Sequence, residues 1–109
     1  MGITKSNLFT DEQNELAKLA KVFAHPARIA IIQHLIQSNA CITGDLVEEI
    51  GLAQATISQH LKELKAAGMI KGTICGTSVN YCIDPLVWKQ IEGRFTGLFQ
   101  SFDPQKTSC

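Results

Sequence analysis

The sequence predicts a mainly α, α+β fold: a winged helix-turn-helix of five helices and one β-hairpin, in the order ααααββα. Two patterns carry this prediction. The stretch 51–72, GLAQATISQHLKELKAAGMIKG, has an apolar residue every three or four positions, which is typical of an amphipathic helix after a tight turn. Two short β runs, 69–74 and 78–83, then enclose Cys75-Gly76-Thr77, which predicts a hairpin directly after that helix.

The composition limits the architecture and the class of partner. A chain of 109 residues that is 45% hydrophobic supports a single domain, here residues 1–109. It contains no apolar run of the roughly 20 residues that span a bilayer and no secretory signal, so we expect a cytoplasmic protein without membrane contact. Ten basic residues balance ten acidic ones, but 51–72 holds three lysines and His60 against one acid.

The first two helices are predicted from their start signals. Thr10 and Gln13 form a capping-box pair that begins a helix over 10–24, preceded by a flexible arm over 1–9. Pro26 begins a second helix, 27–37, which is apolar on nearly all sides and is therefore expected to be the most buried. Residues 38–42 then read as a loop.

The next two helices form the helix-turn-helix. Thr43 is a candidate cap for a short helix over 44–50, and a glycine turn leads into the helix 54–67. Gly68 is expected to end this second helix in a left-handed conformation. Its outward face is polar, as is required to contact base edges and phosphates in a DNA groove.

The last helix, 86–102, follows the Asp84-Pro85 start signal and holds the only Trp and three of the five Phe residues. We expect this helix and the first one (85–102 and 10–24) to form a two-fold dimer interface, with packing inside the monomer as the alternative. Residues 104–109 read as a flexible tail. The predicted interface residues are Leu16, Leu19, Phe23, Trp88, Ile91, Phe95, Leu98, Phe99 and Phe102.

Two segments resemble a known family. VFAHPARIAIIQHL is similar to the second helix of the ArsR/SmtB family of winged helix-turn-helix repressors, and LVEEIGLAQATISQHLKELKAAGMIK resembles its helix-turn-helix. The resemblance implies a homodimeric repressor that binds a palindromic operator on double-stranded DNA through the helix 54–67 and releases it on an effector or redox signal. By position, the implied DNA-binding residues are Gln54, Thr56, Ser58, Gln59, His60, Lys62, Lys65, Lys71, Thr77 and Ser78.

The sequence departs from the family at the start of the reading helix and at the wing. Ala53 stands where the family usually has a Ser or Thr cap, and Ala has no side-chain acceptor. The wing tip, Cys75 to Ser78, lacks the family's arginines. These departures, together with the zero net charge, favour one alternative function: a winged-helix protein-interaction module without DNA binding.

The family's familiar sensor sites are incomplete. Thr43 replaces the second thiolate of the C-x-C site, and Leu86 replaces the histidine of the D-x-H site that begins at Asp84. We therefore expect no metal and no cofactor, and the motifs do not name an effector. Cys75 and Cys82 would lie roughly 13 Å apart along the hairpin, too far to share a metal or a disulfide.

Cys41 remains a candidate thiol sensor. It could approach a cysteine of the other subunit or Cys109 in the tail. Ordinary free cysteines are the preferred interpretation, with a metal or metalloid site and a thiol redox switch as alternatives. A thiol enzyme built on Cys41 is disfavoured because ACITG supplies no base, and no other catalytic constellation is visible, so we expect no enzyme.

Overall fold

The computed structural model describes residues 8–44 and 50–106. Within these ranges there are four α-helices, three strands and one 3-10 turn. In chain order they are α1 (Asp11–Val22), α2 (Pro26–Gln37), β1 (Cys41–Thr43), α4 (Gln54–Ala66), β2 (Ile70–Cys75), β3 (Ser78–Ile83), α5 (Pro85–Gln100) and the 3-10 turn Pro104–Lys106. The fold class agrees with the predicted winged helix-turn-helix.

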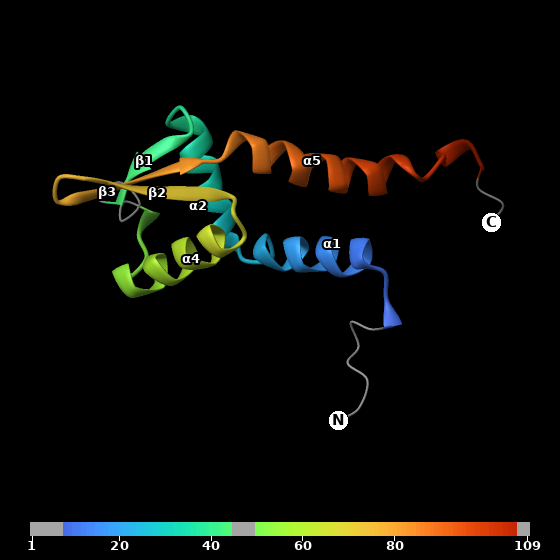
Figure 1. Cartoon of the computed structure of the whole chain (residues 1–109), viewed down its shortest axis with the longest axis horizontal. Coiled ribbons are helices and arrows are strands. Elements are labelled where there is room, and N and C mark those ends of the chain that lie inside the picture. The colour runs from blue at the N-terminus through green and yellow to red at the C-terminus, as the bar shows by residue number, and fades with distance from the viewer. Residues whose placement is uncertain (1–7, 45–49, 107–109) are drawn as a thin grey trace, which may run out of the picture.

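The hairpin and the two outer helices lie at opposite sides of the molecule. Strands β2 and β3 extend from one side, and α1 and α5 project from the other and run side by side (Figure 1). The two helices meet through Phe23 and Phe95, whose ring centroids are 5.9 Å apart at an interplanar angle of 82°. This edge-to-face contact stabilises the base of the projecting pair.

Local signals set the helix ends much as the sequence predicts. The Thr10 hydroxyl accepts from the Gln13 amide at 3.1 Å, and the Gln13 side chain accepts from the Thr10 amide at 3.0 Å, which confirms the capping box. Gly68 has φ +76° after α4, as expected for a left-handed helix stop. Helix α5 ends at Gln100 rather than at 102.

The sheet has one strand more than predicted. Its order is β1-β3-β2, and the hairpin register, with Cys75 opposite Ser78 and Lys71 opposite Cys82, matches the prediction. The predicted loop over 38–42 is wrong at its end, because Cys41–Thr43 is a strand paired antiparallel with β3. Three residues are too few to show a two-residue period, so only the partner strand reveals this one.

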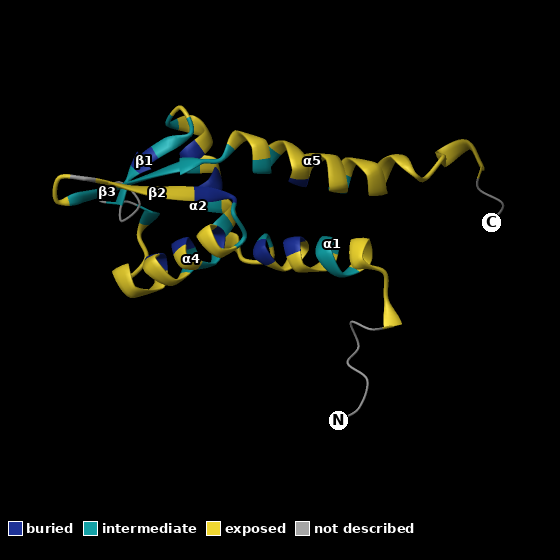
Figure 2. Cartoon of the chain, in the orientation of Figure 1, coloured by how far each residue is buried: buried dark blue, intermediate teal, exposed yellow. Residues whose placement is uncertain are grey.

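The core lies where α2, α4 and the sheet meet. Ile31, Leu35, Ile42, Leu64 and Met69 have essentially no exposed surface. Figure 2 shows this buried centre and the largely exposed far ends of α1 and α5.

Helix α2 is less completely buried than predicted. Ile29 and Ile36 are 37% and 53% exposed, because the described elements pack against only one side of the helix.

Some predictions fall at the ends of the described ranges. The predicted helix 44–50 lies mostly in 45–49, outside the described residues, as do 1–7 of the predicted arm and 107–109 of the predicted tail. Pro104–Lys106, expected to be flexible, forms a 3-10 turn. Over the described ranges, no helix combines the length and apolarity that a membrane crossing demands.

Candidate nucleic-acid interface

Helix α4 has one buried face and one exposed polar face. Ile57, Leu61 and Leu64 are buried in the core. The exposed polar residues of the helix are Gln54, Thr56, Ser58, Gln59, Lys62 and Lys65. Burial of the apolar stripe fixes the rotation of the helix, so the polar face must point to solvent.

A groove separates the start of α4 from the hairpin. It has a volume of about 430 Å³. Four predicted DNA-binding residues line it, and they are Gln54, Ser58, Thr77 and Ser78. The fold thus brings the two predicted contact regions, helix and wing, to one concave polar surface.

The start of α4 has no side-chain cap. Ala53 occupies the N-cap position with extended backbone and makes no capping hydrogen bond. The amides of the first helical turn, which have no partner within the helix, therefore remain available to an anion such as a DNA phosphate. The missing cap weakens the helix and at the same time favours this contact.

His60 lies apart from the exposed polar face. It is half-buried, and its Nδ1 accepts a hydrogen bond from Arg28 Nε at 3.1 Å. The His25 ring centroid lies 5.6 Å away. Burial lowers the pKa of His60, the Arg28 and His25 charges lower it further, and Glu63 acts in the opposite direction. His60 is thereby oriented toward the junction of α1 and α2.

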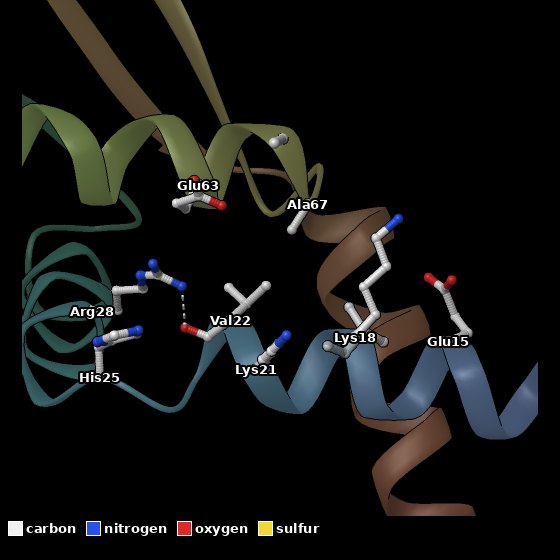
Figure 3. Close-up of a pocket in the computed structure, with 10 residues that line it drawn as sticks. Glu15, Lys18, Lys21, Val22, His25, Arg28, Glu63 and Ala67 are labelled. Atoms are coloured by element: carbon white, nitrogen blue, oxygen red, sulfur yellow. Dashed lines mark hydrogen bonds between the residues drawn. The ribbon is translucent and has the colours of Figure 1, made fainter. Parts of the chain in front are cut away.

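The side of α4 that faces α1 and α2 borders a second groove, of about 560 Å³ (Figure 3). Arg28 lines one edge of it and donates from its guanidinium to the Val22 carbonyl at 3.3 Å. Its charged and titratable lining residues are Glu15, Lys18, Lys21, His25, Arg28 and Glu63. The groove is thus lined by residues of α1, α2 and α4.

The wing carries few free cations. Lys71 forms an ion pair with Asp84 at 3.1 Å, and Asp84 also caps α5 by accepting from the amides of Leu86 and Val87. The ion pair with Lys71 and these amide hydrogen bonds lower the pKa of Asp84. Part of the charge of Lys71 is thus neutralised by the strand-to-helix junction.

The side chain of Lys65 extends from α4 to the wing. A Cβ built on Gly72 of β2 would lie 3.4 Å from Lys65 Nζ, so the ammonium lies against the backbone of the wing. Lys65 thus reaches from the reading helix to the hairpin.

The cysteine prediction needs correction. Cys41 and Cys82 are opposite each other in the β1–β3 register and form a disulfide with a Cα–Cα distance of 4.1 Å. The preference for ordinary free cysteines is therefore wrong for this pair. The sequence carries no signal for this pairing, because residues 38–42 read as a loop and the hairpin spacing relates Cys82 only to Cys75.

The predicted dimer residues separate into three groups. Leu19 and Ile91 are buried inside the monomer. A second group is half-buried, namely Leu16, Phe23, Trp88 and Phe95. At the far end of the last helix, Leu98, Phe99 and Phe102 are 52%, 72% and 63% exposed. Leu19 and Ile91 thus belong to the monomer core, and Phe23, Trp88 and Phe95 pack against it. The three exposed residues form an apolar surface at and just beyond the end of α5.

An exposed polar helix beside a β-hairpin, on a core of helices and a small antiparallel sheet, defines a winged helix-turn-helix protein. Residues 25–71 match the model of the arsR family of bacterial regulatory proteins. The chain is 31% identical over 78 residues to an HTH-type transcriptional regulator of Methanocaldococcus jannaschii, covering 71% of this chain and 88% of that protein. The chain therefore belongs to the ArsR family, whose members are transcriptional regulators and not enzymes.

Two further similar proteins are also described as transcriptional regulators. The HTH-type transcriptional repressor SmtB of Mycobacterium tuberculosis is 42% identical over 64 residues, covering 59% of this chain and 47% of that protein. The chain thus spans about half the length of this relative. A crystal structure described as a possible transcriptional regulator for arsenical resistance matches with a TM-score of 0.66 at 26% identity, covering 76% of this chain and 83% of that one.

Proposed function

We propose that this protein is a cytoplasmic, homodimeric transcriptional repressor that binds a palindromic operator through the helix 54–67 and releases it on an effector or redox signal. One observation carries the proposal: the exposed polar face of α4 and the wing border a single polar groove. A recognition helix in the major groove, with a hairpin against the adjacent backbone, uses such a surface.

The proposed contacts divide by chemistry. The short polar side chains near the start of α4 are suited to read base edges, and the lysines and the wing hydroxyls are suited to bind phosphates. Base contacts are assigned to Gln54, Thr56, Ser58 and Gln59, and phosphate contacts to Lys62, Lys65, Lys71, Thr77 and Ser78. His60 acts at the edge of this surface, since its ring also contacts Arg28.

The proposed dimer uses α1 and α5. The exposed end of α5 presents Leu98 and Phe99 on a helix that already projects from the body, and Phe102 is exposed just beyond that end. A two-fold pairing of this surface would bury it and place the two α4 helices about one DNA turn apart, ~34 Å.

DNA binding is tested by fluorescence anisotropy with a labelled duplex from the region upstream of the chain's own gene. We expect a salt-sensitive complex, weakened about tenfold or more by the double substitution Gln54→Ala, Ser58→Ala. Gln33→Ala, an exposed glutamine on α2, is the matched control and should leave affinity unchanged. Equal loss in the control, or no complex at any salt concentration, would refute the proposal.

Dimerisation is tested by sedimentation. The double substitution Phe99→Ser, Phe102→Ser should convert the dimer to a monomer at micromolar concentration. Ile74→Ser is the control, because Ile74 is 78% exposed but lies on the wing. A dimer that persists in the Phe variant would exclude this surface.

Two observations favour an alternative, a winged-helix protein-interaction module without DNA binding. The wing lysine Lys71 is paired with Asp84, and the net charge is zero. A stable dimer that shows no salt-dependent binding to the upstream duplex would support this function instead.

A further inference from the structure

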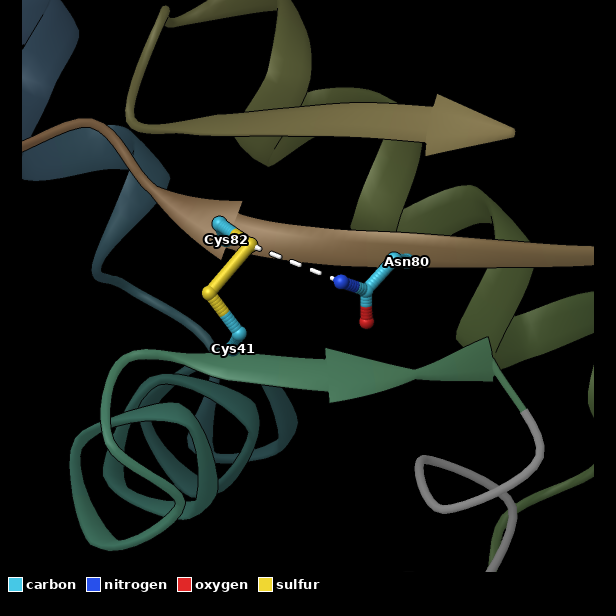
Figure 4. The surroundings of a disulfide bond; sticks show 3 residues. All are labelled: Cys41, Asn80 and Cys82. Atoms are coloured by element: carbon cyan, nitrogen blue, oxygen red, sulfur yellow. Dashed lines mark hydrogen bonds between the residues drawn. A yellow bond between two sulfur atoms is a disulfide. The ribbon is translucent and has the colours of Figure 1, made fainter. Parts of the chain in front are cut away.

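One covalent bond outside the main chain joins the short strand β1 to the wing. Cys41 lies on β1, which leads into the helix-turn-helix, and Cys82 lies on β3, the second strand of the wing (Figure 4). The two residues are 41 positions apart in sequence. The bridge therefore ties β1 to the wing.

We propose that Cys41 and Cys82 form a reversible dithiol–disulfide site that exchanges with small-molecule thiols and disulfides, and that the closed bridge strengthens operator binding. The inference rests on the proposed function, because a DNA-binding regulator works in a reducing compartment. Disulfides are rare there, and those that occur are mostly transient, catalytic or redox-sensing. A bridge at this position is thus expected to open and close.

The surroundings of the pair allow exchange. Cys41 and Cys82 are both half-buried rather than enclosed in the core, so a small thiol can reach a sulfur. The Asn80 amide donates to Cys82 Sγ at 3.9 Å. A donor at this sulfur favours its thiolate form, which makes Cys82 the better leaving group and directs an incoming thiol to Cys41.

The exchange balances without another oxidant. To close the bridge, a Cys41 thiolate attacks a small disulfide RSSR and forms a Cys41–SR mixed disulfide, with release of one RSH. The Cys82 thiolate then attacks the Cys41 sulfur, which forms the Cys41–Cys82 bond and releases the second RSH. Two protein thiols are oxidised and one small disulfide is reduced to two thiols. Opening is the reverse sequence, with RSH attacking Cys41.

Strand β1, which the bridge holds, is short. Strand β1 is three residues long and pairs only with β3. It follows two non-glycine residues with positive φ, Asn39 at 58° and Ala40 at 70°, a conformation that costs free energy. The buried side chain of Ile42 and the ladder hydrogen bonds oppose detachment. Opening the bridge removes the covalent tie and leaves β1 freer to separate from the wing.

The effect on DNA binding follows from preorganisation. With the bridge closed, β1 and the wing keep one relative placement, so the wing loses less conformational entropy when it binds DNA. Linkage then requires that operator DNA shifts the thiol–disulfide equilibrium toward the bridge by the same factor. The change in DNA affinity on closing the bridge and the change in the thiol–disulfide equilibrium on adding DNA therefore measure the same coupling free energy.

The test uses the full chain with Cys75→Ser and Cys109→Ser, which leaves Cys41 and Cys82 as the only two of its four cysteines. Equilibration over a range of reduced-to-oxidised glutathione ratios, followed by thiol counting, should show two thiols converting together within the range. Amide hydrogen exchange at Ile42 and Thr43 should be several-fold faster in the open form. A pair that stays bridged or stays open throughout would overturn the proposal.

Measuring the operator affinity of the bridged and open forms tests the regulatory role of the bridge separately from DNA binding itself. The bridged form should bind the labelled upstream duplex several-fold more tightly than the open form, whereas Cys82→Ser in the same background should bind as the open form in every buffer. Equal or weaker binding by the bridged form would overturn the regulatory role. No binding in either state, with thiol conversion intact, would refute the proposed function and the regulatory role while leaving the exchange site standing.

The same redox series measures the role of Asn80. Asn80→Ala should slow opening of the bridge by reduced glutathione several-fold, because the Cys82 thiolate loses its donor. Thr73→Ala, on the strand opposite Asn80, is the control and should leave the rate unchanged. An unchanged rate in the Asn80 variant would remove Asn80 from the mechanism.

Discussion

Arg28 Nε donates a hydrogen bond to His60 Nδ1 at 3.1 Å, and the same guanidinium donates to the Val22 carbonyl at 3.3 Å. One side chain of α2 thereby contacts both the end of α1 and the reading helix α4. If α1 belongs to the dimer interface, Arg28 is a direct polar connection between that interface and the reading helix.

The first prediction concerns pH. Nδ1 of His60 accepts a hydrogen bond, so protonation there breaks it, and burial lowers the pKa of His60 below its ordinary value. The unfolded chain then binds a proton more readily than the folded one. This contribution to stability is complete above about pH 6.5 and is lost as the pH falls through the folded pKa. Urea unfolding of wild type and His60→Asn from pH 8 to 5 should show the wild type losing more stability.

The second prediction concerns Arg28. Arg28→Lys keeps the charge but cannot place two donors on His60 and Val22, so we expect the free energy of unfolding to fall by about 1–2 kcal/mol. Lys18→Ala, in the same groove, is the control and should change stability by less than about 0.5 kcal/mol. Identical denaturation midpoints for Arg28→Lys and wild type would show that these contacts are dispensable.

The third prediction concerns the uncapped reading helix. Ala53→Ser adds an acceptor at the N-cap of α4, and we expect about 1 kcal/mol of added stability. The control is Ala55→Ser, two residues further into the helix, where serine should be neutral or slightly destabilising. Thermal unfolding measures both. A gain in both variants, or in neither, would contradict the capping explanation.

The fourth prediction concerns Asp84, which pairs with Lys71 and caps α5. Asp84→Asn keeps a capping oxygen and loses the ion pair, whereas Asp84→Ala loses both, so melting temperatures should fall in the order wild type, Asn, Ala.

The folded pKa of Asp84 is lowered, so its contribution is present above the unfolded value, about 3.9, and is lost as the pH falls through the folded value. An acid-unfolding profile of Asp84→Asn identical to that of wild type would count against this.

The fifth prediction compares two glycines. Gly68→Ala should destabilise by about 1–2 kcal/mol, because φ is +76° there, although a Cβ would meet Val87 only at an ordinary 3.8 Å. Gly93→Ala lies inside α5, where a Cβ meets nothing within 4 Å, so the monomer should gain about 0.5–1 kcal/mol. Denaturant titration of each variant tests the opposite signs. Equal signs would refute the conformational argument.

Much of the fold could be predicted because its signals are local. The capping box joins Thr10 to Gln13, the left-handed stop needs only Gly68, and the hairpin register follows from a two-residue turn at Gly76-Thr77. Each feature depends on residues within a few positions of one another, where side-chain chemistry restricts the backbone directly. The exposed polar face of α4 likewise follows from its own apolar stripe.

The sequence by itself therefore determined the fold class, the family and the face of α4 that meets solvent. Tertiary structure alone decided which cysteines pair, that Arg28 contacts His60, and that Lys71 pairs with Asp84. These contacts join residues 41, 32 and 13 positions apart, and a single residue carries no mark of so distant a partner. Strand β1 explains why the cysteine pairing in particular could not be predicted. Its three residues form a strand only because β3 lies beside them, and only that pairing brings Cys41 to Cys82.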